Sequence, residues 1–533
     1  MFRFVDAGLV PDGCPSREEF AAQLQELSSD LPRINRLFER TMAAAAEADS
    51  KSAATLEPAA ESDVESTDTT PEATQTEWRA EALRAMAAGK VAVVVLAGGQ
   101  GTRLGSSLPK AAYDAGLPSG KVLARLQAER IQRLRSLAAV EAGVEATSVR
   151  VPWYVMTSPQ THEATVRCFE EASFFGLPRE DVTLFQQGQL PCLSGDGKLL
   201  LESATSVAMA PDGNGGIYRA LHRSGCVADM ERRGVRLLHA YAVDNLVSKV
   251  ADPVFVGLCL SSGAEMGSKV VPKSSPGEKV GVLCRKGGRF AVVEYSDMAD
   301  SLKEERLGDA DDAPLRFRAG NICVHAYTLD FLRGPAHPDR LSDVFHVARK
   351  AIPFADPATG ATVPKSSLTE INGVKLESFI FDVFEEAKAM ALLEVRREDE
   401  FSPVKNAPAQ GKGDSPDSAR DMVSAEGRRW LAAAGVMVEG AGAVEVSPLV
   451  SYGGEGLRVL AGRTLTAPLL LCLRPEVDGL AIGAEASAHS ADALPSGPVL
   501  HSFVGCSRPV DPVLGIPGDT VRFNTYAIGA PAE

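Results

Sequence analysis

The segment VAVVVLAGG at residues 91–99 is a continuous apolar run that ends in glycines. A run with no polar face predicts a strand that is buried on both sides, as inner strands of a parallel sheet are. Helical stretches at 121–140 and 160–172 separate some of the other strand candidates. Those candidates are 151–157, 182–187, 236–244, 254–260 and 281–286. The alternation predicts an α/β fold with a doubly wound, mostly parallel sheet and right-handed crossovers.

The segments around this pattern differ from it in composition. Apolar residues recur at helical spacing near the N-terminus, which predicts a helical segment within 1–42. Residues 43–76 are rich in Ala, Ser, Thr and Glu and have few large apolar side chains, so we expect a disordered acidic linker or insertion there. The α/β domain is expected over 77–405. A smaller, β-rich C-terminal domain is expected over 406–533, and its tail from about 473 has no motif that we can assign.

The net charge of the chain bears on which partners it can bind. Its 533 residues include 55 Lys and Arg against 70 Asp and Glu, a net charge of −15. This balance argues against a basic surface that binds nucleic acid or an anionic membrane. About half of the excess lies in residues 47–77, which contain nine acidic side chains and one lysine. The net charge therefore says little about a site elsewhere in the chain.

Cysteine usage and hydropathy favour a cytoplasmic protein. The nine cysteines are scattered and form no Cys-x-x-Cys pair, which favours reduced, mostly buried thiols. No signal peptide is visible at the N-terminus. No window approaches the ~18 uncharged apolar residues of a membrane span.

The most informative segment follows the first strand: LAGGQGTRLGSSLPK, residues 96–110. Its glycines allow close approach of a ligand and present backbone N–H groups to an anion, and Arg103 and Lys110 add positive charge. The spacing Gly99-x-Gly101-x-x-x-Gly105 is one residue too long for a dinucleotide fingerprint. A phosphate-binding P-loop is also excluded, because no Ser or Thr follows the Gly-Lys pair further along. A glycine-rich strand–helix turn without a ligand is the alternative.

This loop closely resembles the signature loop of eukaryotic UDP-N-acetylglucosamine (UDP-N-acetylhexosamine) pyrophosphorylases. The resemblance covers roughly 80–472. It continues through FFGLPREDVTLFQQGQLPCLS, SVAMAPDGNGGIYRAL, YAVDNLVSKVADPVFVG, VVEYS, AGNI, KLESFIFDVF, REDEFSPVKNA and VSPLVSYGGEGL. It implies a Rossmann-like, GT-A-like nucleotidyltransferase fold. The reaction that it implies joins UTP and N-acetylglucosamine 1-phosphate into UDP-N-acetylglucosamine and pyrophosphate.

Such a reaction needs no general base, because the sugar phosphate is already an anionic nucleophile. The obstacle is repulsion between two polyanions, so catalysis consists of positioning and of stabilisation by cations. By resemblance, Arg103 and Lys110 face the triphosphate, and Asp244 matches the aspartate associated with Mg²⁺, for which Mn²⁺ is an alternative. Lys405 and Lys375 are further phosphate-binding candidates. Lys405 lies at an expected hinge, which suggests that movement of the C-terminal domain closes it over the substrates.

The resemblance also implies residues that bind the nucleoside and the sugar. The nucleotide is lined by Leu96, Ala97, Gly98 and Gly99, and the uracil by Gln187 and Gly213. The sugar is held by Asn214, Gly281, Glu294 and Asn321. Phe379 and Phe381 are expected on one face of a strand, where they would wall the acetyl methyl group, although alternate phenylalanines are more often plain core.

Other functions stay open at this point. The substrate could instead be glucose, galactose or N-acetylgalactosamine 1-phosphate, although APDGNGG and the Phe-x-Phe element resemble the N-acetylhexosamine branch more. A catalytically silent nucleotide-sugar sensor would not need every phosphate-binding group. The hypothesis of a structural or interaction protein would leave the whole set of phosphate-binding candidates unexplained.

Overall fold

The computed structural model describes residues 2–48, 56–310, 312–341, 344–408 and 413–473, together with the backbone of two strands at 498–503 and 523–527. The predicted tail from about 473 otherwise lies outside the described residues.

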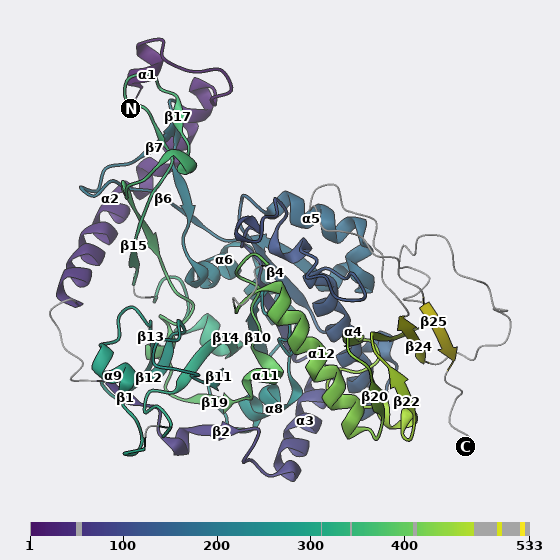
Figure 1. Cartoon of the computed structure of the whole chain (residues 1–533). Coiled ribbons are helices and arrows are strands. Elements are labelled where there is room, and N and C mark those ends of the chain that lie inside the picture. The colour runs from purple at the N-terminus through teal and green to yellow at the C-terminus, as the bar shows by residue number, and fades with distance from the viewer. Residues whose placement is uncertain are drawn as a thin grey trace.

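One mixed, mostly parallel sheet forms the centre of the molecule (Figure 1). Its main row runs β2 (Val64–Ser66), β19 (Met390–Glu394), β11 (Met266–Pro272), β14 (Ala319–Thr328), β10 (Leu237–Ala242), β3 (Val91–Leu96), β4 (Trp153–Thr157) and β5 (Val182–Gln186). Within this row, β14 alone is antiparallel to its neighbours. The hairpin of β12 (Val282–Lys286) and β13 (Arg289–Val293) joins β14 from the side. The predicted α/β fold with a mostly parallel sheet is confirmed.

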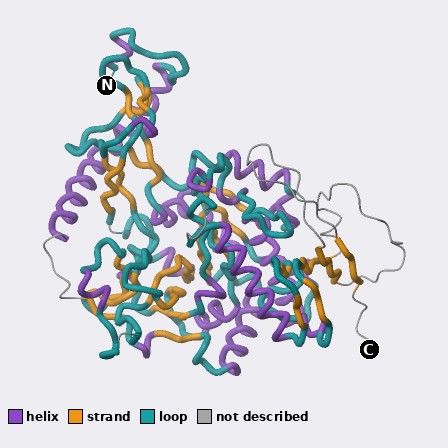
Figure 2. The backbone as a smooth tube through the Cα atoms, in the orientation of Figure 1, coloured by secondary structure: helices purple, strands orange, loops and turns teal. Residues whose placement is uncertain are grey.

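Strand β3 is buried on both faces, as its apolar run predicts. Val91, Val93 and Val95 belong to one hydrophobic core, and Ala92 and Val94 belong to the core on the other side. The first core is covered by α3 (Glu72–Ala87), α4 (Leu123–Ala142) and α8 (Pro253–Ser261). The second is covered by α6 (Ile217–Arg223), α7 (Cys226–Arg233) and α10 (Leu329–Arg333). The tube in Figure 2 shows these helices around the orange strands.

The strand order reverses at β3. The chain runs from β3 to β4 and β5 on one side, and then returns to add β10 on the other side of β3. In open α/β sheets a crevice forms outside the carboxyl ends of the strands at such a reversal, and ligands bind there. The topology therefore places the expected site at the ends of β3 and β10.

An arm extends away from the sheet (Figure 1). Its long helix α2 (Arg17–Ala48) packs Ile34 and Leu37 against Phe345, Val374 and Leu376. Around it lie the strand pairs β6 (Gln189–Pro191) with β9 (Met209–Pro211), β7 (Leu201–Ser203) with β8 (Ser206–Val207), and β15 (His346–Lys350) with β18 (Gly373–Glu377). The expected helical N-terminal part is confirmed.

The C-terminal region is small and rich in strands. Helix α12 (Pro416–Ala433) precedes the pair β20 (Met437–Glu439) and β22 (Thr464–Thr466). A second sheet joins β21 (Val444–Val446), β23 (Leu469–Leu473), β24 (Pro498–Phe503) and β25 (Phe523–Ala527). Ser119 binds this region to the α/β part, because its hydroxyl and backbone N–H both donate to the buried carboxylate of Glu445.

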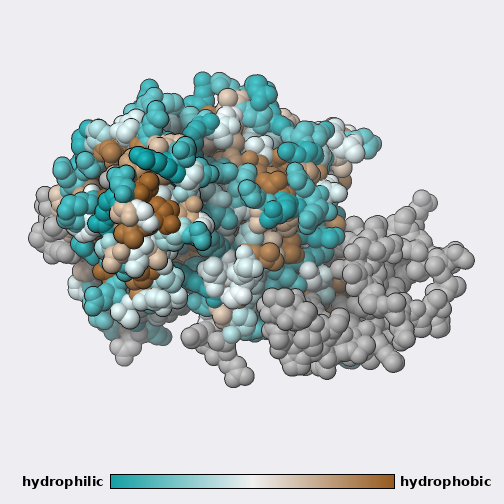
Figure 3. Space-filling view, turned by 90° about the horizontal axis from the view of Figure 1, so that it is seen from above, coloured by the Kyte–Doolittle hydropathy of each residue, from teal (hydrophilic) through white to brown (hydrophobic). Residues whose placement is uncertain are grey.

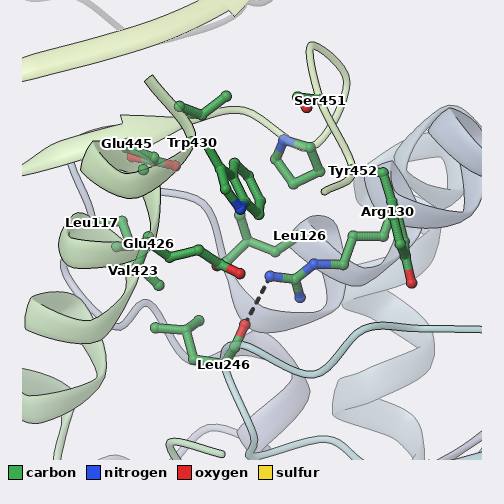
Figure 4. A pocket seen from close by; sticks show the side chains of 13 residues that line it. Leu117, Leu126, Arg130, Leu246, Val423, Glu426, Trp430, Glu445, Ser451 and Tyr452 are labelled. Atoms are coloured by element: carbon green, nitrogen blue, oxygen red, sulfur yellow. Dashed lines mark hydrogen bonds between the residues drawn. The ribbon is translucent and has the colours of Figure 1, made fainter. Parts of the chain in front are cut away.

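A cavity of about 30 Å³ remains between α4 and α12 (Figure 4). The Arg130 guanidinium reaches across it to donate to the carbonyl of Leu246 at 2.9 Å, and the Glu426 side chain points toward the same place. This space lies between the two parts of the chain, and Leu246, four residues beyond the end of β10, is among the residues that line it.

Two of the predicted segments have a different secondary structure. Residues 254–260 form α8 instead of a strand, because Pro253 begins a helix whose cap is the Asp252 side chain accepting from the Val254 N–H at 3.2 Å. Residues 43–48 continue α2, and 56–76 contain β1 (Leu56–Pro58), β2 and the start of α3, so they are not a disordered linker. Backbone pairing holds this segment: β1 pairs with β12 and β2 with β19. The remaining part of the predicted linker, 49–55, lies outside the described residues.

The face seen in Figure 3 is mostly hydrophilic. Seen from above, hydrophobic side chains gather in small groups among hydrophilic ones (Figure 3). In the part of the chain that the structure describes, no helix is long and apolar enough to cross a membrane. The eight cysteines in that part are all free, and five of them are buried.

Candidate active site

Lys110 and Asp244 come together beyond the carboxyl ends of β3 and β10. The Lys110 Nζ donates to Asp244 Oδ2 at 2.8 Å, and the two side chains are 15% and 17% exposed. Lys110 comes from the loop after β3, and Asp244 lies two residues beyond β10. Partial burial strengthens this ion pair relative to one at the surface, because less water screens it.

The loop after β3 turns back on itself and so directs the Lys110 side chain. The Gly101 N–H donates to the Leu108 carbonyl at 3.1 Å, and the Lys110 N–H donates to the Gly99 carbonyl at 3.2 Å. A Cβ at Gly99 would lie 3.5 Å from Lys110 Cδ, so the lysine stem runs along that glycine. Arg103, on the short helix η2 (Thr102–Leu104), is exposed.

Gln187 meets the same loop from the other side. It follows β5, and its N–H donates to the Thr157 carbonyl at 2.9 Å. Its side-chain Oε1 would lie 2.5 Å from a Cβ placed on Gly98, so any side chain there would require the glutamine to move. Leu96 ends β3, and the Ala97 N–H still donates to the Met156 carbonyl at 2.8 Å. The structure thus joins Gly98 and Gln187, two of the residues predicted to bind the nucleotide.

The loop with Gly213 and Asn214 packs against residues 378–381. Gly213 has φ +90°, and the Ser378 backbone fills the space that a Cβ would need. The Asn214 Oδ1 accepts from the Ile380 N–H at 3.0 Å, and the Ser378 N–H donates to the Asp212 carbonyl at 2.8 Å.

Asp212, which the sequence did not single out, is nearly buried in this loop. Burial raises its pKa to about 6, although the charges of Arg219 and Arg223 oppose the shift. Its Oδ1 has no hydrogen-bond partner among the described residues.

Gly281, Glu294 and Asn321 come together beside the β12–β13 hairpin. The Asn321 N–H donates to the Gly281 carbonyl at 2.8 Å, and Glu294 Oε1 would lie 3.3 Å from a Cβ on Gly281. Burial, together with the charge of Asp297, raises the pKa of Glu294, while His346 and Lys405 oppose this shift. Lys405 and His346 therefore act electrostatically on one of the predicted sugar-binding residues.

The two phenylalanines are not on a strand. Phe379 and Phe381 lie in the turn after β18, where their ring centroids are 5.1 Å apart. Phe381 is buried in the second core and Phe379 is partly buried. The turn replaces the expected strand because the Asp382 carboxylate accepts the Phe379 N–H at 2.7 Å.

Lys405 lies beside the end of β10, but Lys375 lies elsewhere. The Val404 N–H donates to the Asp244 carbonyl at 2.8 Å, which puts Lys405 next to the end of β10. Its Nζ is 3.8 Å from Asp414 Oδ2, and both side chains are more than 40% exposed. Lys375 lies on β18 in the arm, where its charge acts on the buried thiol of Cys192. No described contact joins Lys375 to Asp244.

Asp244 fits a divalent cation held by few protein ligands. Across the described ranges, no three or more His, Cys, Asp and Glu side chains cluster to hold a metal ion. Mg²⁺ commonly keeps water and phosphate ligands and takes one or two carboxylates. Lys110 donates to Oδ2 of Asp244, and no described group donates to Oδ1.

A family model described as UTP–glucose-1-phosphate uridylyltransferase matches residues 33–410. The solved structure of the UDP-N-acetylglucosamine pyrophosphorylase from Trypanosoma brucei resembles the chain with a TM-score of 0.71 and 28% identity. That match covers 84% of this chain and 95% of the other. Fold and site therefore define a nucleotidyltransferase.

Two relatives show to which group of nucleotidyltransferases the chain is similar. UDP-N-acetylhexosamine pyrophosphorylase-like protein 1 of Xenopus tropicalis is 46% identical over 71% of this chain and 76% of its own length. UDP-N-acetylglucosamine diphosphorylase 2 of Arabidopsis thaliana is 43% identical over 86% of this chain and 90% of its own. The chain belongs to the UDP-N-acetylglucosamine (UDP-N-acetylhexosamine) pyrophosphorylases of the uridylyltransferase family. Uridylyltransferases of this family generally use a divalent metal.

Proposed function

We propose that the protein converts UTP and N-acetylglucosamine 1-phosphate into UDP-N-acetylglucosamine and pyrophosphate. The observation that carries the proposal is the contact between Lys110 and Asp244 at the sheet reversal. The Lys110 stem runs along Gly99, and the neighbouring Gly98 meets the Gln187 side chain. A phosphate-binding cation, a metal-binding carboxylate and a base-binding amide then share one crevice.

The reaction forms one P–O bond and breaks another. A phosphate oxygen of the sugar phosphate attacks the α-phosphorus of UTP in line with the bond to the β-phosphate. That bond breaks, and its electron pair leaves with pyrophosphate. No proton must move, so the protein contributes position and positive charge.

Lys110 and Arg103 supply that charge to the triphosphate. The loop after β3 presents its backbone beside them, and its glycines let the phosphates approach closely. Lys405, exposed beside the end of β10, approaches from the segment that leads into the C-terminal region. Lys375 has no part in this proposal, because its strand belongs to the arm.

The base and the sugar are bound on opposite sides of the phosphates. The Gln187 amide pairs with the amide-like edge of uracil above Gly98. Glu294 and Asn321 form hydrogen bonds with the sugar hydroxyls and the acetamido group. Phe379 contacts the methyl group of the acetamido group. A carboxylate with a raised pKa is a good acceptor for a hydroxyl proton.

We infer that Asp244 holds the divalent metal, and that this metal is Mg²⁺ or, in its place, Mn²⁺. When bound, it supplies Lewis-acid stabilisation to the phosphate oxygens. Removal of metal by a chelator should stop turnover, and Mg²⁺ should restore it. Turnover that persists in excess chelator would contradict this assignment.

The test is pyrophosphate release from UTP and Mg²⁺ with each sugar 1-phosphate in turn. We expect the highest kcat/KM with N-acetylglucosamine 1-phosphate. A preference for glucose 1-phosphate or N-acetylgalactosamine 1-phosphate would show that the proposed sugar substrate is wrong. The absence of release with every sugar would favour a nucleotide-sugar sensor.

A further inference from the structure

Two residues hold Phe379 from different directions where the arm meets the central sheet. The ring of His346 stacks on the ring of Phe379, with centroids 4.3 Å apart and planes inclined by 28°. His346 Nε2 lies 2.8 Å from Asp382 Oδ1. Oδ2 of the same carboxylate accepts the Phe379 N–H at 2.7 Å. Asp382 thus links the histidine to the backbone of the phenylalanine.

The strand pairing of the arm places His346 at this point. In the antiparallel pair of β15 and β18, His346 lies opposite Glu377, two residues before Phe379. The backbone ladder sets this register. The imidazole is therefore carried to Phe379 by a strand pair and not by a flexible loop.

The charges around His346 favour its protonated form. Burial lowers the pKa of His346, but the hydrogen bond and charge of Asp382, with Asp297 and Glu294, outweigh burial and raise it. Glu377 faces it across the strand pair. The imidazole thus stacks on Phe379 and interacts electrostatically with Glu294, and both of these residues are assigned to the sugar.

We propose that His346, held by Asp382, is a positioning residue that determines specificity for the N-acetyl group of the sugar phosphate. It fixes the plane of the Phe379 ring and places a positive charge near Glu294. The inference rests on the proposed function, because that function assigns Phe379 and Glu294 to the sugar.

The test compares three variants with the wild-type enzyme. His346→Ala removes both the stacking and the hydrogen bond, whereas His346→Phe keeps a stacked ring without the hydrogen bond. His337→Ala is the matched control, because His337 is also about one-third exposed and has an aspartate neighbour, Asp339. Steady-state KM and kcat are measured for UTP, N-acetylglucosamine 1-phosphate and glucose 1-phosphate, with melting curves of each variant.

We expect His346→Ala to raise the KM for N-acetylglucosamine 1-phosphate about tenfold, which corresponds to roughly 1.4 kcal/mol. The KM for UTP should stay unchanged, and the KM for glucose 1-phosphate should change much less. His346→Phe should recover part of the loss. In the wild type the KM for the N-acetylated sugar should rise as the pH passes upward through the raised histidine pKa, and this dependence should disappear in both variants. The control should behave as wild type.

Equal increases in KM for all three substrates, or an unchanged N-acetyl preference in both variants, would overturn the role of His346 while leaving the proposed function intact. Failure of the proposed function is visible separately, in the wild type alone, as a lack of activity with N-acetylglucosamine 1-phosphate. In that case the role of His346 in specificity is also wrong.

Discussion

Lys110 and Asp244 are 134 positions apart in the chain, yet their charged groups meet at 2.8 Å. The sheet reversal between β3 and β10 produces this contact, because the two strands run parallel and end at the same edge. The lysine follows one strand and the aspartate the other. In the proposed mechanism, their pairing keeps a cation in place for the phosphates and a carboxylate in place for the metal.

Replacing Lys110 by Ala should lower kcat about 100-fold, the usual scale for removing one group that stabilises developing charge. Steady-state pyrophosphate release measures it. Asp244→Asn should raise the Mg²⁺ concentration needed for half-maximal activity. The exposed pair Lys198 and Asp196, 2.7 Å apart in the arm, provides the control, and Lys198→Ala should be neutral. Wild-type kcat in Lys110→Ala would remove this lysine from the mechanism.

Gly98→Ala should raise the KM for UTP while the protein still folds. The added Cβ would lie 2.5 Å from Gln187 Oε1, the end of a flexible side chain, so the glutamine turns away and the backbone is kept. Gly195→Ala is the control, since nothing lies within 4 Å of its Cβ position. Unchanged UTP binding by calorimetry in Gly98→Ala would contradict the placement of uracil at Gln187.

Lys405→Ala should slow a single turnover, because the lysine contributes charge only after it approaches the phosphates. Rapid-quench measurement with enzyme in excess separates this step from product release. Asp414→Asn should have little effect, because an exposed pair at 3.8 Å contributes only about 0–1 kcal/mol. Equal single-turnover rates for wild type and Lys405→Ala would exclude closure of this lysine over the substrates.

Glu426→Gln should stabilise the protein at alkaline pH. Burial raises the pKa of Glu426 to about 7, against the charges of Lys249 and Arg130. A raised pKa means that the folded state binds the proton more tightly. The stability from this group is complete below pH ~4.5 and is lost as the pH rises through 7.

The advantage of the glutamine variant should therefore grow between pH 5 and pH 8, by at most roughly 3 kcal/mol. Denaturant unfolding at both pH values measures the difference. An equal difference in the free energy of unfolding at both pH values would show that Glu426 does not titrate there.

Local patterns predicted the parts of the fold whose signal lies within a few residues. The run at 91–96 has apolar residues at every position, so it reads as a doubly buried strand without further information. The wrong prediction of a strand at 254–260 also comes from reading a short local pattern. A short apolar run fits a buried strand and a buried helix equally, and only Asp252 and Pro253 at its start favour the helix. The edge strands β1 and β2 were missed because backbone hydrogen bonds hold them and their side chains carry little apolar signal.

Of the predicted cations, the structure separates Lys405 from Lys375. Both occur in motifs of the family, but Lys405 follows Val404, which binds the Asp244 carbonyl, and Lys375 lies on β18 in the arm. No sequence pattern singled out His346 or Asp382, because their pairing depends on the register of β15 and β18.

By itself the sequence determined the buried strand, the glycine loop after it and the identity of the charged groups. These features depend on side-chain chemistry and on backbone freedom within a short segment. The tertiary structure decided which of those groups share a crevice, because distant strands come together only through sheet order and register. The contacts of Asp244 with Lys110, of Gly98 with Gln187 and of Phe379 with His346 all belong to that second kind.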